Sequence, residues 1–208
     1  MSASSTAAPP LRGARLPRQE RRAQLLESAL EVFVAQGYHS AAMDDIADRA
    51  GVSKPVLYQH FPSKLDLYVA LLEAGRDRLI SLVREALLST TDNKLRVYAA
   101  TDAYFAFVEE SAGAFRLVFE SDLTNVKQVR DLIDSANAEI ALLISEVIAE
   151  DTGLSQPEAM LLGTGLAGAA QTAARHWLHE PGQLTRGDAA ALVARLQWRG
   201  ISGVPRHP

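Results

Sequence analysis

A glycine-linked pair of short, apolar-faced segments constrains the fold of this chain more than any other feature of its sequence. In residues 43–50, Ile46 and Ala50 recur at helical spacing, and Gly51 follows where the backbone must leave the helix. Ser53 is then the predicted N-cap of a second short helix. Two short helices joined in this way are typical of a helix-turn-helix, whose second helix enters the major groove of DNA.

The predicted second helix leaves a polar surface outside. Leu57 and Phe61 are expected to face the core, because they are apolar and four residues apart. The candidate DNA-binding residues are Ser53, Pro55 and Gln59 near bases, Tyr58 and His60 near phosphate or sugar, Lys54 and Lys64 on phosphates, and Arg18 ahead of the first helix. The alternative is an ordinary pair of packed helices, because a glycine turn also joins helices outside DNA-binding proteins.

The charges are divided unevenly along the chain. Residues 1–64 hold eight Lys and Arg against six Asp and Glu, a balance of +2, whereas residues 65–208 hold 13 against 19, a balance of −6. This asymmetry favours a basic DNA-binding end attached to an acidic domain. Residues 1–18, rich in Pro, Ser, Ala and Gly, are expected to form a disordered basic arm that follows DNA. The alternative for this arm is a solvated tail.

Composition favours a protein of the cytoplasm. A chain of 208 residues with 48% hydrophobic content suits one or two compact domains with a buried core. It has no apolar run of 18 residues and no apolar N-terminal stretch typical of a signal peptide, so we expect no membrane partner. The absence of cysteine excludes disulfides, thiolate catalysis and cysteine-based zinc sites.

The remaining sequence predicts helices throughout. Apolar residues recur at helical spacing in residues 95–108, 126–148, 157–179 and 185–198, and no alternating strand pattern is evident. We therefore predict an all-α fold, in which an N-terminal three-helix domain contains the helix-turn-helix and a C-terminal helical bundle follows.

One of these predicted helices, in residues 157–179, is unusually rich in small residues. A glycine in a helix interior costs about 1 kcal/mol relative to alanine, so its glycines indicate that something approaches this helix closely. Close packing of another helix and room for a ligand are the two interpretations. The small residues include Gly163, Gly165, Gly168 and Ala169.

Apolar and aromatic side chains from three predicted helices are candidates for the lining of a ligand cavity. They are Tyr98, Thr101, Tyr104, Phe105, Phe115, Phe119, Ile133, Ala136 and Ile140. A cavity of this kind would bind a small hydrophobic effector. The alternative for each residue is the ordinary core of a helical bundle, because apolar stripes at helical spacing build a core as well.

The N-terminal region carries a set of residues with specific spacing. It consists of Phe33, Gly37, Tyr38, Met43, Ile46, Ala47, Ala50, Gly51, Val52, Ser53, Leu57, Tyr58, His60, Phe61, Ser63 and Lys64. This set resembles the signature of the TetR family of bacterial transcriptional regulators. The resemblance implies a homodimer on double-stranded operator DNA. Ala42 departs from the family, which often has threonine there, so backbone N–H groups would make the phosphate contact expected of that hydroxyl.

The resemblance also implies how the chain is divided. Residues 1–18 would be the arm, 19–66 the helix-turn-helix DNA-binding domain, and 67–204 a helical domain for ligand binding and dimerisation. In TetR-family proteins the last two helices pair with their symmetry mates in a four-helix bundle. This arrangement implies a dimer interface that contains Gly165, Gly168, Ala169, Leu192 and Leu196.

Segments outside the DNA-binding motif extend the resemblance to a narrower group. The runs STTDN, FRLVFESD, ARHWL and WRGISGVP are similar to those of actinobacterial TetR-type regulators of fatty acid synthase genes. The likeness implies operators at fatty acid synthesis genes, a long-chain acyl-coenzyme A effector that lowers DNA affinity, and activation of transcription as one output. The candidates for contact with the coenzyme A phosphates are Arg76, Arg78, Arg116, Lys127 and Arg130.

The sequence shows no arrangement typical of catalysis or of a bound metal, so we expect neither an enzyme nor a cofactor. His176 and His179 share a helix face, but a metal site needs a third converging ligand, and the pair suits a helix end. Three other functions stay open. They are a TetR-type repressor of efflux genes that senses other hydrophobic compounds, a helical acyl-binding module without DNA binding, and a helical enzyme acting on a thioester.

Overall fold

The structure, a computed structural model, describes residues 16–111, 113, 116, 123 and 125–200. Its helices are α1 (Arg18–Ser40), α2 (Met43–Arg49), α3 (Lys54–His60), α4 (Lys64–Leu88), α5 (Asn93–Glu110), α7 (Lys127–Thr152), α8 (Gln156–His179) and α9 (Arg186–Arg199). No strand occurs in these described ranges. The predicted all-α fold is therefore confirmed.

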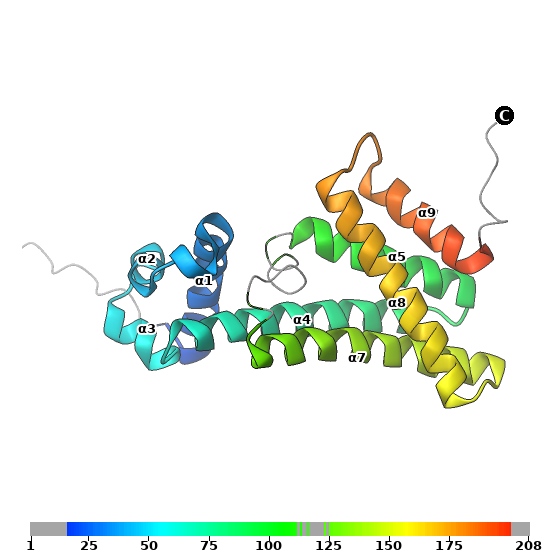
Figure 1. The fold of residues 1–208 in the computed structure, drawn as a ribbon, viewed down its shortest axis with the longest axis horizontal. Coiled ribbons are helices and arrows are strands. Elements are labelled where there is room, and N and C mark those ends of the chain that lie inside the picture. The colour runs from blue at the N-terminus through cyan, green and yellow to red at the C-terminus, as the bar shows by residue number, and fades with distance from the viewer. Residues whose placement is uncertain (1–15, 112, 114–115, 117–122, 124, 201–208) are drawn as a thin grey trace, which may run out of the picture.

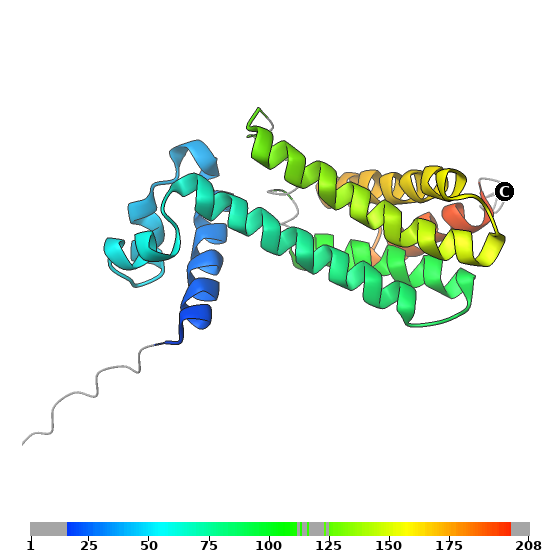
Figure 2. The ribbon, with the colours of Figure 1, turned by 90° about the horizontal axis from the view of Figure 1, so that it is seen from below.

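The long helix α4 joins two groups of helices (Figure 1). The small group, α1 to α3, lies at the beginning of α4. In the larger group, α5 and α7 pack along α4, while α8 packs on α7 and α9 packs on α5. Figure 2 shows the same division from a second direction, with α4 running from one group into the other. Any movement of α4 therefore changes the position of one group relative to the other.

Local signals account for several helix ends. Ser63 caps α4 by accepting a hydrogen bond from the Asp66 amide, and Thr185 does the same at the start of α9. In α8, Ser155 and Glu158 form a reciprocal capping box, in which the Ser155 amide donates to the Glu158 carboxylate over 2.9 Å. These interactions join residues three positions apart, so they depend on the local sequence alone.

The turn between α2 and α3 has the geometry expected of a helix-turn-helix. Gly51 adopts a φ of 64°, in the left-handed region that favours glycine. The Val52 amide then donates to the Ala47 carbonyl over 3.0 Å. Ser53 occupies the N-cap position of α3, but its hydroxyl makes no capping hydrogen bond. The Ser53 side chain therefore does not stabilise α3 in the way that the sequence predicts.

The first core lies among α1, α2, α3 and the beginning of α4. Phe33, Ile46, Leu57 and Phe61 are buried there, and each such side chain contributes about 1.5–3 kcal/mol to folding. The beginning of α7 joins the same core, because Val129 is buried in it and Leu132 and Ile133 pack against it. Ile133, a predicted cavity residue, therefore packs against the core of the small group.

The second core holds the larger group together. It contains Leu79 and Val83 from α4 and small residues of α8 such as Ala170. At Gly163 of α8 an added Cβ would lie 2.4 Å from the Ala141 carbonyl oxygen of α7. Close packing of α7 on α8 therefore explains this glycine. An added Cβ at Gly165 or Gly168 would meet open space. Close packing within the chain therefore does not explain these two glycines.

The predicted boundary between residues 66 and 67 falls inside α4, which continues unbroken from Lys64 to Leu88. The division of the chain at that position remains a prediction. Residues 1–15 of the predicted arm lie outside the described residues. No helix in the described part of the chain has both the length and the apolar character needed to cross a membrane.

Candidate nucleic-acid interface and effector cavity

Helix α3 presents its polar residues at the outer end of the small group. Leu57 is its one buried residue and points into the first core. The predicted DNA-binding residues Ser53, Lys54, Pro55, Tyr58 and Gln59 are exposed, and His60 is half-buried. The structure thus brings these six residues together on the solvent side of a seven-residue helix, which is the size and polarity that a major groove admits.

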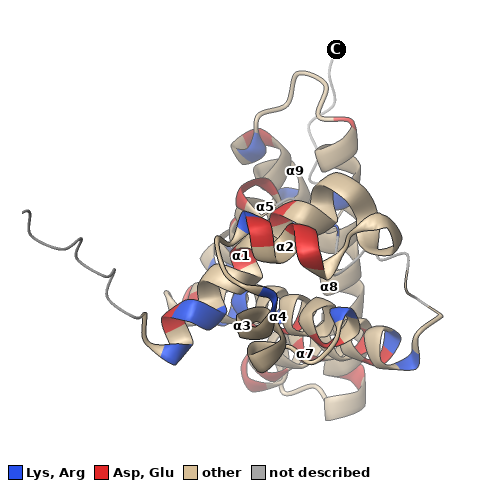
Figure 3. Ribbon diagram, turned by 90° about the vertical axis from the view of Figure 1, so that its left-hand side faces the viewer, with Lys and Arg blue, Asp and Glu red and all other residues tan. Residues whose placement is uncertain are grey.

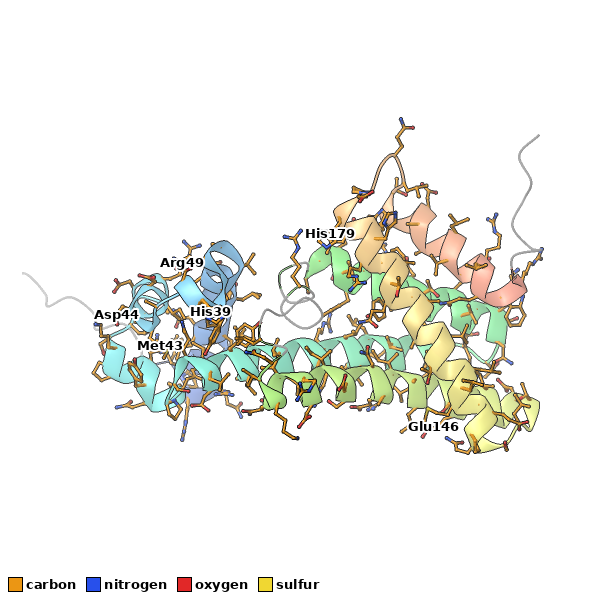
Figure 4. All side chains as sticks on the ribbon, viewed as in Figure 1. His39, Met43, Asp44, Arg49, Glu146 and His179 are labelled. Carbon is orange, nitrogen blue, oxygen red and sulfur yellow. The ribbon has the colours of Figure 1, made fainter. Side chains whose placement is uncertain are left out.

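Lys54, at the start of α3, is held by α2. Its Nζ donates to Asp44 Oδ2 over 2.5 Å, and this hydrogen bond, followed by the charge of Asp44, raises the pKa of the Lys54 ammonium. Both side chains are more than half exposed. Asp44 is labelled at the outer end of the molecule in Figure 4. An exposed ion pair is weak in water, so a DNA phosphate can replace the carboxylate as the partner of Lys54.

Lys64 has a different environment from the one predicted. Its Nζ donates to the carbonyl oxygens of Tyr38, His39 and Ala41 over 2.7, 3.2 and 2.8 Å. The ammonium also lies 4.6 Å from the centre of the Tyr38 ring. Because an ammonium has three donors, these three carbonyls occupy it fully. These contacts tie Lys64 to the end of α1 and to the chain before α2, and its predicted phosphate contact stays a prediction.

The beginning of α1 adds a basic edge beside α3. We call Arg18, Arg21 and Arg22 the arginine edge. Burial lowers the pKa of His60, and the positive charges of the arginine edge lower it further, so these groups lie close together. The Arg22 guanidinium stacks 4.4 Å from the centre of the Phe61 ring.

Figure 3 looks onto this end of the molecule and shows basic positions at the start of α1 and acidic positions on α2. Arg18 is thus next to α3, as predicted for a DNA contact. Arg21 and Arg22 lie on the same edge, and their place in the run of arginines before the first apolar stripe favours contact with DNA for them as for Arg18.

A cavity of about 540 Å³ lies within the larger group of helices, a size typical of small-molecule sites. We call it the bundle cavity. Its wall comes from α4, α5, α7, α8 and α9 and is mainly apolar, and its apolar side chains include Val83, Leu87, Val97, Ile140, Ile144, Val147 and Leu166. Such a space binds a ligand through burial of apolar surface.

Some predicted ligand-binding residues line the bundle cavity and others do not. Thr101, Tyr104 and Ile140 line it. Phe105 and Ala136 are fully buried in the protein and are not among its lining residues. Tyr98 belongs to a separate shallow depression between α5 and α9. The predicted residues Phe115 and Phe119 lie outside the described side chains.

Beyond Ile140, the lining from the second half of α7 and from α8 is not among the cavity residues that the sequence predicts. The apolar stripe that continues through Ile144 and Val147 was the signal for it. The cavity is therefore shifted along α4, away from the helix-turn-helix.

The polar groups of the bundle cavity are almost all satisfied by the protein. The Thr101 hydroxyl lies 2.7 Å from the Val97 carbonyl and 3.0 Å from Gln197 Oε1. At the other end, Arg96 donates to Asn93 Oδ1 over 3.0 Å and to Asp151 Oδ2 over 3.2 Å. Arg96 is the one Lys or Arg among the cavity's described lining residues.

An exposed apolar surface runs along α8 and α9. Leu192 and Leu196 are exposed, as are Gly165 and Ala169, and Gly168 is half-buried. Leu161, Leu162 and Trp198 are also exposed, and they line the bundle cavity as well. A contiguous exposed apolar surface marks an interaction site. The predicted dimer residues therefore lie where a partner can reach them.

The histidines of α8 gather no metal-ligand set. His179 is labelled at the end of α8 in Figure 4. Among the described residues, no three His, Asp or Glu side chains come together in a way that would hold a metal ion.

The matches to known proteins agree with this geometry. The family model for bacterial regulatory proteins of the tetR family matches residues 25–71, which include α2 and α3. The HTH-type transcriptional activator FasR of Mycolicibacterium smegmatis is 46% identical over 194 residues, which cover 93% of this chain and 89% of that protein. The regulator SrpR of Pseudomonas putida is also 46% identical, but over 61 residues, or 29% of each chain.

Solved structures share the whole fold. A TetR-like transcriptional regulator from a Rhodococcus species has a TM-score of 0.73 with 26% identity, and the match covers 91% of this chain and 100% of that one. A tetR-family regulator from Streptomyces coelicolor has a TM-score of 0.71 with 24% identity and covers 88% and 80%. An exposed helix-turn-helix on such a fold defines a DNA-binding regulator of transcription. The chain belongs to the TetR family, whose members matched here are regulators and not enzymes.

Proposed function

We propose that this regulator controls genes of fatty acid or lipid biosynthesis and senses a long-chain acyl-coenzyme A, which lowers its affinity for DNA. The observation that supports this proposal is the extent of the likeness to FasR, which continues through 93% of the chain. A match confined to the helix-turn-helix, such as that to SrpR, carries no information on the effector. The proposal therefore depends on the C-terminal half, where the resemblance to regulators of fatty acid synthase genes also lies.

The bundle cavity supports an acyl ligand. Its wall is mainly apolar, as an alkyl chain requires, and its volume of about 540 Å³ suits a small molecule. None of the predicted cationic residues lines it, whereas Arg96 does. Lys127, one of those candidates, is paired with Asp131 on the surface of α7. We therefore assign contact with the coenzyme A phosphates to Arg96 first.

The helix α4 supplies the coupling between effector and DNA. Val83 and Leu87 of α4 line the bundle cavity, and Lys64 at the other end of the same helix holds the chain before α2. In a homodimer, two copies of α3 read half-sites about 34 to 36 Å apart. A ligand that displaces α4 changes this spacing and hence the affinity for DNA. By linkage, DNA lowers the affinity for the ligand by the same factor.

The exposed apolar surface of α8 and α9 supports the homodimer. Leu192 and Leu196 would pack against the partner's copy of the same surface, as a twofold interface requires. The small residues Gly165 and Ala169 would let the two copies of α8 approach closely, because glycine has no side chain and alanine has only a methyl group.

The proposal is tested by titrating the purified protein onto its own upstream DNA and onto fatty acid synthase promoter fragments at fixed salt. Each titration is repeated with palmitoyl-coenzyme A. We expect specific binding that the ligand weakens. Specific binding that is indifferent to the ligand would leave the DNA-binding regulator and overturn the acyl effector.

A variant that fills the bundle cavity separates the two halves of this test. Ile144→Phe is expected to weaken ligand binding at least tenfold, because the larger ring occupies cavity volume, while DNA binding without ligand stays as in the wild type. Leu142→Phe is the matched control, since Leu142 lies on α7, is exposed and does not line the cavity. Wild-type ligand affinity in Ile144→Phe would show that the ligand does not use this cavity.

A further inference from the structure

Tyr104 differs from the other polar residues in the wall of the bundle cavity, because its buried hydroxyl has no hydrogen-bond partner in the part of the chain that the structure describes. Tyr104 lines the cavity, is 3% exposed, and its hydroxyl is the buried side-chain polar atom of the described residues that has no hydrogen-bond partner. A buried donor without a partner destabilises the folded protein. Burial also raises the pKa of this phenol far above its ordinary value, so Tyr104 is a neutral donor at physiological pH.

The surroundings of Tyr104 restrict what its hydroxyl can meet. Apolar residues such as Phe107 and Ile140 share its buried cluster, and the hydroxyl of Thr101, one turn away on α5, is already held by Val97 and Gln197. The nearest cation on the cavity wall, Arg96, precedes it by eight residues on α5, which is about 12 Å along a helix axis. A carboxylate beside Tyr104 would therefore be buried without a counter-ion, whereas a neutral oxygen would need one donor and no charge.

We propose that Tyr104 is a specificity residue, whose hydroxyl donates a hydrogen bond to a neutral oxygen atom of the bound effector. This inference rests on the proposed function, in which the effector is an acyl thioester. Two groups of the effector could supply this neutral acceptor oxygen. They are the carbonyl of the thioester and a hydroxyl on the acyl chain. In either case the apolar wall holds the chain, and Tyr104 recognises the oxygen. A free fatty acid whose carboxylate reaches Tyr104 is rejected, because the cavity's cation, Arg96, lies about 12 Å away along α5.

The test measures dissociation constants by calorimetry for the wild type and Tyr104→Phe with three probes. They are palmitoyl-coenzyme A, the S-hexadecyl-coenzyme A thioether that lacks the carbonyl, and a hydroxypalmitoyl-coenzyme A. Loss of one hydrogen bond predicts about fivefold weaker binding. A loss for the two acyl probes and none for the thioether identifies the thioester carbonyl. A loss for the hydroxylated probe alone identifies a chain hydroxyl. Equal affinities of wild type and variant for all three overturn the inference.

Two controls keep the result interpretable. Tyr98→Phe removes a hydroxyl from the same helix outside the bundle cavity and is expected to keep wild-type affinities. Tyr104→Phe without ligand is expected to melt at or above the wild-type temperature, because it removes a hydroxyl that has no partner. A lower melting temperature would show that the hydroxyl is satisfied within the protein and overturn the inference. If the wild type binds none of the probes, the proposed function itself fails, a result distinct from equal binding by both proteins.

Discussion

The DNA-binding end and the bundle cavity use polar side chains in opposite ways. Around α3 the polar groups are exposed, and the ion pair of Lys54 with Asp44 is open to exchange with a phosphate. In the bundle cavity Thr101 is buried, and its hydroxyl lies within hydrogen-bonding distance of Gln197. Binding at the first site therefore depends on charge and salt, whereas binding at the second depends on shape and on the matching of a few hydrogen bonds.

The largest expected effect comes from breaking the packing of the larger group. Gly163→Ala places a Cβ against the Ala141 carbonyl oxygen, a backbone atom that cannot turn away. We expect a loss of about 3 kcal/mol in the free energy of unfolding, at the upper end of overpacking effects, measured by chemical denaturation. Gly187→Ala in α9 is the control, since an added Cβ there meets only Thr185 Oγ1 at 4.0 Å. Equal stability of the two variants would contradict the tight α7 to α8 contact.

The next effect distinguishes a structural lysine from a DNA-binding one. Lys64→Ala removes the donor that three backbone carbonyls share, and we expect it to lower the free energy of unfolding by about 2 kcal/mol. The dependence of DNA binding on salt should keep its wild-type slope. Lys94→Ala, which removes an exposed lysine of α5, should leave stability unchanged. A reduced salt slope with unchanged stability would restore the phosphate contact that the sequence predicts for Lys64.

The exposed lysine of α3 should show the reverse behaviour. Lys54→Ala is expected to weaken binding to all DNA sequences about equally and to reduce the salt slope by about one, because one phosphate contact is lost. Thermal melting should match the wild type, since the ion pair with Asp44 is exposed. Fluorescence anisotropy on operator and random DNA at several salt concentrations measures both quantities. A change in base preference without a change in slope would refute this role.

The smallest expected effect concerns His60, which is half-buried, unlike the exposed residues of α3 and the buried ones of the bundle cavity. Burial and the arginine edge lower its pKa from the ordinary 6.5, so the unfolded chain binds its proton more readily than the folded one. Stability should therefore rise with pH through the range just below 6.5 and be lost as the pH falls through it. In His60→Gln this part of the pH dependence of thermal melting should disappear. An unchanged pH dependence would place its origin in another group.

The same contrast explains which parts of the site the sequence predicts. The exposed residues of α3 follow from one short motif, since Gly51 ends α2 and Leu57 sets which side is buried. The bundle cavity is harder to predict, because Tyr98 and Thr101 lie about one turn apart on α5 and both are candidates by their helical spacing. Thr101 lines the cavity and Tyr98 does not, and only the position of α9 decides this.

The sequence by itself determines the helices, the caps at Ser63, Ser155 and Thr185, and the helix-turn-helix, because these depend on residues within about four positions of one another. Tertiary structure alone decides that Lys64 binds carbonyls 23 to 26 residues away, that Gly163 receives the backbone of α7, and that five helices leave a cavity beside Tyr104. A stripe of apolar residues at helical spacing looks the same in the sequence whether it fills a core or lines a cavity. The distances between helices decide which of the two forms, and a local sequence pattern does not specify these distances.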